Sequence, residues 1–116
     1  MKTYQGSCHC GAITYEVIAD FTEGIKCNCS HCSRKAFLLA SVPQEAFTLK
    51  TGGDNLTKYQ FNKKHIDHLF CKTCGVQSFA RGGDQAGNIM VGINLNCLED
   101  FDTSTLKVIE YDGKSL

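Results

Sequence analysis

Cys8-His9-Cys10 is the first of three cysteine clusters in this 116-residue chain, and it is followed by Cys27-Asn28-Cys29-Ser30-His31-Cys32 and Cys71-Lys72-Thr73-Cys74. These first, middle and third clusters contain seven of the eight cysteines. Thiolates two or three residues apart on a tight turn can bind one metal ion, and a closed zinc site takes four of them. The number and spacing of the clustered cysteines therefore predict one closed four-thiolate site and one three-thiolate site with an open position for water or substrate.

Spacing alone does not decide how the clusters combine. We expect the first and third clusters to share the closed site, because joining them would cross-link the first strand to the second half of the chain. The middle cluster is compact enough to bind a metal ion by itself. A site that joins the first cluster to the middle one is also compatible with the spacing, and this alternative stays open here.

Disulfides or a redox dithiol are the other uses of clustered cysteines. A redox C-x-x-C is expected at a helix start within a βαβ unit, and no such pattern occurs in this chain. Met1–Ser7 has no apolar run of the signal-peptide kind, and no stretch approaches the roughly 20 apolar residues of a membrane span. We therefore expect a cytoplasmic protein, in which cysteine clusters indicate metal binding or catalysis.

Composition favours a single globular domain over residues 1–116. Hydrophobic residues make up 42% and charged residues 21%, and Lys plus Arg and Asp plus Glu both total 12. A net charge of zero gives no electrostatic footprint for nucleic acid or an anionic membrane, so neither is an expected partner. Exposed strand edges would allow a homodimer, although no stripe of residues identifies an interface.

Short strands separated by turns dominate the pattern. Gly11–Ile18 alternates Ile13, Tyr15 and Val17 with more polar residues, as a half-buried strand does. Further strands are expected at Leu56–Phe61, Ile66–Cys71, Gln77–Arg81 and Asn88–Leu95, with weaker candidates at Phe37–Val42 and Leu106–Tyr111. Short helical turns are expected at Ser30–Lys35, Pro43–Ala46 and Cys97–Asp100. No window sustains a 3.6-residue period over three turns, so we predict a mainly β, mostly antiparallel fold.

The order of these motifs also resembles a known family. Gly6–Ala12, Cys27–Cys32 and Phe70–Val76, together with Asn94–Leu98 and Tyr111–Ser115, resemble the glutathione-dependent formaldehyde-activating enzyme (GFA) family, which includes the centromere protein V domain. The resemblance covers nearly the whole chain. It implies an Mss4-like (β-tent) fold of antiparallel sheets with short helical turns, stabilised by zinc.

The resemblance also implies two Zn²⁺ ions per chain. A structural zinc would be bound by the first and third clusters, through Cys8, Cys10, Cys71 and Cys74. A catalytic zinc would be bound by the middle cluster, through Cys27, Cys29 and Cys32.

The activity attached to the family is condensation of formaldehyde with glutathione to S-(hydroxymethyl)glutathione, a carbon–sulfur lyase reaction. Three thiolates give a Zn²⁺ site a net negative charge, which suits it less to ionising water than to accepting an incoming thiol as its thiolate. We therefore expect a zinc-dependent carbon–sulfur lyase that acts on a small thiol, glutathione or similar, and an aldehyde. Because fold does not fix function, a non-catalytic zinc module that binds a protein partner is the alternative.

Charged and titratable residues near the middle cluster are candidates for substrate binding and proton transfer. Arg34 and Lys35 follow Cys32 and could bind the carboxylates of glutathione. Weaker candidates for the same role are Lys63, Lys64 and Arg81. His31 lies within the cluster and could act as a general acid or base, or could be a partly exposed turn residue.

Three further residues carry no expected role in binding a metal ion. His65 and His68 would point to opposite faces of a strand, so neither is expected to be a ligand. Cys97 is the leftover thiol, and a single cysteine is more often a small buried hydrophobe than a redox or catalytic group.

Overall fold

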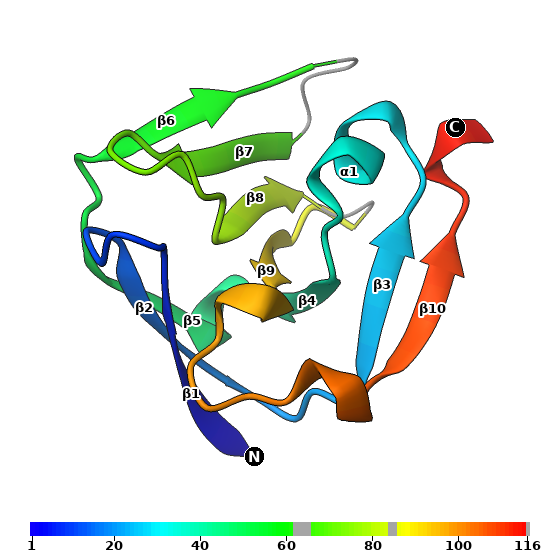
Figure 1. Ribbon diagram of the computed structural model, residues 1–116, viewed down its shortest axis with the longest axis horizontal. Coiled ribbons are helices and arrows are strands. Elements are labelled where there is room, and N and C mark those ends of the chain that lie inside the picture. Colours follow the sequence, from blue (N-terminus) through cyan, green and yellow to red (C-terminus); the bar gives the residue numbers. More distant parts are fainter. Residues whose placement is uncertain (62–65, 84–85, 116) are drawn as a thin grey trace.

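The computed structural model describes residues 1–61, 66–83 and 86–115. Within them the chain forms ten strands, one α-helix and four short 3₁₀ turns (Figure 1). The strands are β1 (Lys2–Ser7), β2 (Thr14–Ala19), β3 (Glu23–Cys27), β4 (Leu39–Pro43), β5 (Phe47–Thr51), β6 (Leu56–Tyr59), β7 (Ile66–Cys71), β8 (Phe79–Gly83), β9 (Ile89–Asn94) and β10 (Lys107–Tyr111). The helix is α1 (Ser30–Lys35), and the 3₁₀ turns are η1 (Gln44–Ala46), η2 (Leu95–Cys97), η3 (Thr103–Thr105) and η4 (Gly113–Ser115).

The strands form two sheets. The smaller sheet has the order β1-β2-β5, and the larger has the order β10-β3-β4-β9-β8-β7-β6. All pairs are antiparallel except β10 with β3, which run parallel. The predicted mainly β, mostly antiparallel class is therefore confirmed. The parallel pair was not predicted, and it brings the C-terminal end of the chain beside α1 (Figure 1).

The core joins the two sheets through aromatic rings. Tyr15 and Val17 on β2 are fully buried, while Ile18, on the opposite face of the strand, is exposed. This is the alternation that a period-2 pattern predicts. The Tyr15 ring lies 5.3 Å from that of Phe47 in the same sheet and 5.9 Å from that of Phe79 in the larger sheet. Such ring pairs stabilise a fold beyond the area that they bury.

Several predicted boundaries differ from the observed ones. Ile66–Cys71 and Ser30–Lys35 match β7 and α1, but β2 starts only at Thr14, because the chain before it bends around Cys10. The turn predicted at Cys97–Asp100 is wrong. The helical turn lies at Leu95–Cys97 instead, because the Asn94 side chain caps it by accepting a hydrogen bond from the Asn96 N–H.

Three strands, β1, β3 and β5, were not predicted from the sequence. β1 and β3 each bury only a glycine, so no apolar alternation marks them. Lys63, Lys64 and His65 lie outside the described residues. None of the helices within residues 1–61, 66–83 and 86–115 has the length and apolar character to cross a membrane.

Strand β9 offers a direct test of the core. Ile93 is completely buried, whereas Ile89 on the same strand keeps 47% of its surface exposed. Ile93→Ala should lower the free energy of unfolding by about 2–5 kcal/mol, because it removes buried methyl groups and leaves a cavity. Ile89→Ala is the matched control and should change it by less than about 0.5 kcal/mol. If urea denaturation gave the same loss of unfolding free energy for both variants, Ile93 would not be part of the core.

Candidate metal centres

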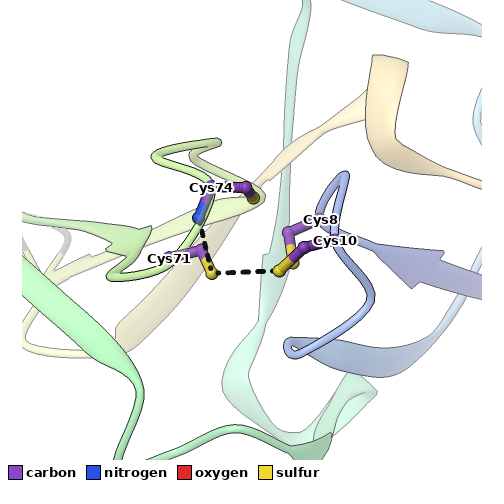
Figure 2. Close-up of side chains that lie close together, drawn as sticks. All are labelled: Cys8, Cys10, Cys71 and Cys74. Atoms are coloured by element: carbon purple, nitrogen blue, oxygen red, sulfur yellow. Dashed lines mark hydrogen bonds between the residues drawn. The ribbon is translucent and has the colours of Figure 1, made fainter.

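Four cysteines from two distant turns meet between the sheets (Figure 2). Cys8 and Cys10 lie in the turn between β1 and β2, while Cys71 ends β7 and Cys74 follows in the next turn. Their four sulfur atoms all lie within 4.8 Å of one another. The Cys10 sulfur lies 3.7 Å from that of Cys8 and 3.6 Å from that of Cys71. Four sulfurs placed tetrahedrally at about 2.3 Å from a zinc ion would be about 3.8 Å apart, so the spacing fits such an ion.

Both turns of this four-sulfur group have a glycine immediately after the second cysteine. Gly11 has a φ of 83° and Gly75 a φ of 79°. Residues with side chains rarely adopt these values, whereas glycine does so readily. In each turn, glycine therefore lets the chain reverse direction while both of its cysteine sulfurs point to one centre.

Backbone N–H groups point at the sulfurs. The N–H groups of Thr73 and Cys74 lie 3.3 and 3.5 Å from the Cys71 sulfur, and the Asn55 side-chain amide lies 3.5 Å from it. The Cys74 N–H is the main cause of the lowered pKa of the Cys71 thiol. The Val76 N–H, with others, lowers the pKa of the Cys74 thiol to about 6. Hydrogen bonds of this kind stabilise thiolates and orient metal ligands.

The Cys10 thiol behaves in the opposite way. The Ala12 N–H lowers its pKa, but burial and the neighbouring thiols outweigh that effect and raise it to about 11. Like charges in such close contact disfavour one another, so the four sulfurs ionise together only around a cation. The group thus has the ligand spacing and the electrostatics of a site for a dication.

The other three clustered cysteines form a second, three-sulfur group where β3 leads into α1. Cys27 is the last residue of β3, Cys29 caps the N-terminus of α1, and Cys32 lies in its first turn. Their sulfurs lie within 4.8 Å of one another, and all three residues are half-buried. Among the described residues, no fourth Cys, His, Asp or Glu belongs to this group.

The hydrogen bonds of the three-sulfur group come from its own backbone. The N–H groups of Cys29 and Cys32 lie 3.5 Å from the Cys27 sulfur and 3.3 Å from the Cys29 sulfur, respectively. Burial raises the pKa of the Cys29 thiol, but hydrogen bonds from the Cys32 N–H, from the neighbouring thiols and from the His31 N–H outweigh it, and the net shift is downward. Burial is also the first cause that raises the pKa of the Cys32 thiol, to about 12. Here too, full ionisation calls for a bound cation.

Two cavities flank helix α1. The sulfur-lined cavity, of about 450 Å³, is bounded by Cys27 and Cys32 together with Lys26, Glu110, Tyr111 and Asp112, among others. The basic cavity, of about 380 Å³, is bounded by His31, Arg34, Lys35, Tyr59, Phe70 and Gly75. The helix separates them because residues three and four positions apart share one face.

The proposed substrate-binding cations therefore line the basic cavity rather than the sulfur-lined one. Arg34 donates a hydrogen bond to the Ser30 carbonyl oxygen, 2.8 Å away. Lys35 donates to the side-chain oxygen of Gln77, and its ammonium lies 5.6 Å from the centre of the Phe70 ring. Burial lowers the pKa of Lys35. Arg81 borders neither cavity, and its Nε is buried without a hydrogen-bond partner among the described residues.

A stack of rings around His31 was missed at the sequence level. The His31 ring lies 4.1 Å from that of the buried His68, 5.7 Å from that of Tyr59 and 5.1 Å from that of Phe61. Burial is the main cause that lowers the pKa of His31, and it lowers the pKa of His68 to about 4. Both imidazoles are therefore neutral at pH 7. Tyr59 pairs directly with His68 across β6 and β7. This pairing would have indicated the ring stack, but the sequence does not show the register of the two strands.

Cys97 belongs to neither sulfur group. It is half-buried, and its sulfur lies 4.0 Å from the Gln77 carbonyl oxygen. The structure therefore divides the eight thiols into four, three and one, and the first two sets are the groups expected from the sequence.

Comparisons with known proteins agree with this arrangement. The family described as "Glutathione-dependent formaldehyde-activating enzyme" matches residues 3–110, a range that contains both sulfur groups. The fold is also similar to the crystal structure of a Rhodobacter sphaeroides protein from a structural genomics programme, with a TM-score of 0.77 and 28% sequence identity. That similarity covers 90% of this chain and 99% of the other. With the two sulfur groups, the family match confirms the predicted Mss4-like fold.

The four-sulfur group predicts a metal ion that stabilises the fold. Cys71→Ser should remove one metal ion per chain and lower the free energy of unfolding by an amount on the order of 5 kcal/mol, because binding of a structural zinc ion contributes about 10–16 kcal/mol to folding. Elemental analysis and urea denaturation measure the two effects. Cys97→Ser is the matched control and should leave the metal content unchanged. If both variants kept the wild-type metal content and stability, the four-sulfur group would not be a metal centre.

Proposed function

This chain belongs to the glutathione-dependent formaldehyde-activating enzyme family, and from that premise we propose that it is a zinc-dependent carbon–sulfur lyase. Its substrates would be a small thiol, glutathione or similar, and an aldehyde, with S-(hydroxymethyl)glutathione formed from glutathione and formaldehyde as the family reaction. One observation carries the proposal: the three-sulfur group is half-buried beside a cavity and, among the residues that the structure describes, it is one ligand short of a closed site.

The two sulfur groups would have different roles. The four-sulfur group would hold a structural zinc ion, since four thiolates leave no position for substrate. Cys27, Cys29 and Cys32 would hold the catalytic one. A zinc ion bound by these three thiolates would favour ionisation of an incoming thiol at the remaining position. Soft thiolate ligands select zinc over harder cations such as magnesium.

The sulfur-lined cavity would receive the thiol substrate. Its volume of about 450 Å³ is within the range of small-molecule sites. Lys26 borders it and offers a cation for a substrate carboxylate. Arg34 and Lys35 remain our proposed contacts for the other charged groups of a peptide thiol, which they would meet in the basic cavity across α1.

His31 would move the proton of the reaction. Its imidazole is neutral at pH 7 because burial lowers its pKa, and its Nδ1 is buried with no hydrogen-bond partner in the described part of the chain. In the direction of synthesis, the sulfur electron pair of the thiol forms the new bond to the aldehyde carbon. The aldehyde oxygen takes up the carbonyl electron pair and a proton. Because the His31 ring lines the basic cavity across α1 from the sulfur-lined one, His31 would relay the proton released by the thiol to that oxygen through water and not by direct contact with the thiol.

We also propose that residues 1–116 act as one domain. The buried core contains residues from both sheets, Tyr15 and Val17 from one and Phe79, Val91 and Ile93 from the other. Neither sheet would bury its apolar face without the other.

Substitution of a single ligand tests the proposal. Cys29→Ser should reduce the enzyme-dependent rate of adduct formation from glutathione and formaldehyde by at least about 100-fold, since changes in outer-shell partners alone already cost about 10–100-fold. Exchange NMR measures this rate above the spontaneous reaction, and circular dichroism checks that the fold is retained. Cys97→Ser serves as the control and should keep the wild-type rate. A folded Cys29→Ser protein with the wild-type rate would favour a non-catalytic module instead.

A further inference from the structure

The C-terminal end of the chain packs directly on the three-sulfur group. Because β10 runs parallel to β3, Tyr111 lies opposite Cys27, the last residue of β3. The backbone N–H of Asn28 then donates to the Tyr111 carbonyl oxygen, 3.1 Å away. In Figure 1, β10 accordingly runs beside β3, and both strands end near α1.

Gly113 leaves no room for a side chain at this contact. A Cβ atom added there would lie 2.5 Å from the Cys27 sulfur and 3.3 Å from the Cys29 Cβ. A 2.5 Å contact requires something to shift, and a sulfur that binds a metal ion is not free to do so. Gly113 is not among the residues with positive φ, so the position needs glycine for space and not for backbone conformation.

Side-chain hydrogen bonds fasten the same turn to the cysteine loop. One Asp112 carboxylate oxygen accepts from the side-chain amide of Asn28 at 2.9 Å, and the other accepts from the Ser115 hydroxyl at 2.6 Å. Asn28 separates Cys27 from Cys29, so these bonds hold the backbone between two of the three sulfurs. Hydrogen bonds to a carboxylate are among the stronger ones in proteins.

We propose that this C-terminal clasp, formed by Asp112, Gly113 and Ser115 with Asn28, positions Cys27 and Cys29 as metal ligands. It covers the Cys27 sulfur on one side and leaves the sulfur-lined cavity as the approach to the group. The inference deepens the proposed function and rests on it, because it takes the three-sulfur group to bind a metal ion. The family model matches residues 3–110, and the clasp follows that range directly, in the Tyr111–Ser115 segment that also resembles the family in sequence.

Enlarging Gly113 tests the steric part of the clasp. Native mass spectrometry should find two zinc ions in the wild-type protein and one in Gly113→Val. In Gly113→Ala, release of the second ion to the chelator 4-(2-pyridylazo)resorcinol should be about 10-fold faster, the size of effect expected for an outer-shell change. Gly53→Ala is the matched control, because a Cβ there meets only the Leu49 Cδ2 at 3.5 Å. If Gly113→Val kept both ions with the wild-type release rate, the clasp would be refuted.

Substitutions at Asp112 test the hydrogen-bonded part of the clasp. Comparing alanine with asparagine at this position separates positioning of the cysteines from a general effect on folding. Asp112→Ala should speed zinc release from the three-sulfur group several-fold. Asp112→Asn keeps a side-chain oxygen that can accept from Asn28, so it should restore most of the wild-type retention. Equal release rates for wild-type protein and Asp112→Ala would overturn this part of the inference.

A metal-independent measurement distinguishes failure of the clasp from failure of the proposed function. If wild-type protein binds only one zinc ion, the proposed catalytic centre is wrong whatever the clasp does. The clasp is then judged in protein treated with chelator, from the rate at which iodoacetamide alkylates Cys27 relative to Cys32. Gly113→Val should raise that ratio several-fold by displacing the covering turn, and an unchanged ratio would refute the clasp.

Discussion

The contact between two cysteine turns is the constraint on which the rest of the structure depends. The sulfurs of Cys10 and Cys71 are 61 positions apart in the chain, yet they lie 3.6 Å from each other. One turn belongs to the small sheet and the other to the large sheet, so the four-sulfur group fixes how the sheets are placed. A metal ion there would close a long loop of the chain. Closing the loop costs conformational entropy, and the binding energy of the ion must offset that cost. The shared aromatic core around Tyr15 supports the same placement.

Chemical function follows from the difference between two groups made of the same ligand. In the four-sulfur group, the ligands come from two opposed turns and surround a centre (Figure 2). In the three-sulfur group, one strand end and one short helix supply all the ligands, so the opposite side stays open to the sulfur-lined cavity. The parallel strand β10 brings Asp112 and Gly113 against a further side of the three-sulfur group. An open position, a cavity and a neutral imidazole are the features that our proposed thiol chemistry needs.

Much of this arrangement could be predicted from the sequence because it depends on local pattern. The alternation around Tyr15 and Val17 marked β2, and the cysteine spacing with the family resemblance gave the two sulfur groups. The remainder depends on which strands pair. The contact of His31 with His68 requires the β6–β7 register, and the packing of Gly113 on Cys27 requires the parallel β10–β3 pair. The β10–β3 pairing leaves no periodic signal, since β3 buries only a glycine and β10 is exposed throughout.

Native mass spectrometry of the wild-type protein, with and without glutathione, tests the central claim most directly. A closed four-thiolate centre and an open three-thiolate centre predict two zinc ions per chain. They also predict that one glutathione, and not two, joins the complex. A protein that carries no zinc, or two zinc ions with no affinity for the thiol, would contradict the assignment of an open catalytic centre.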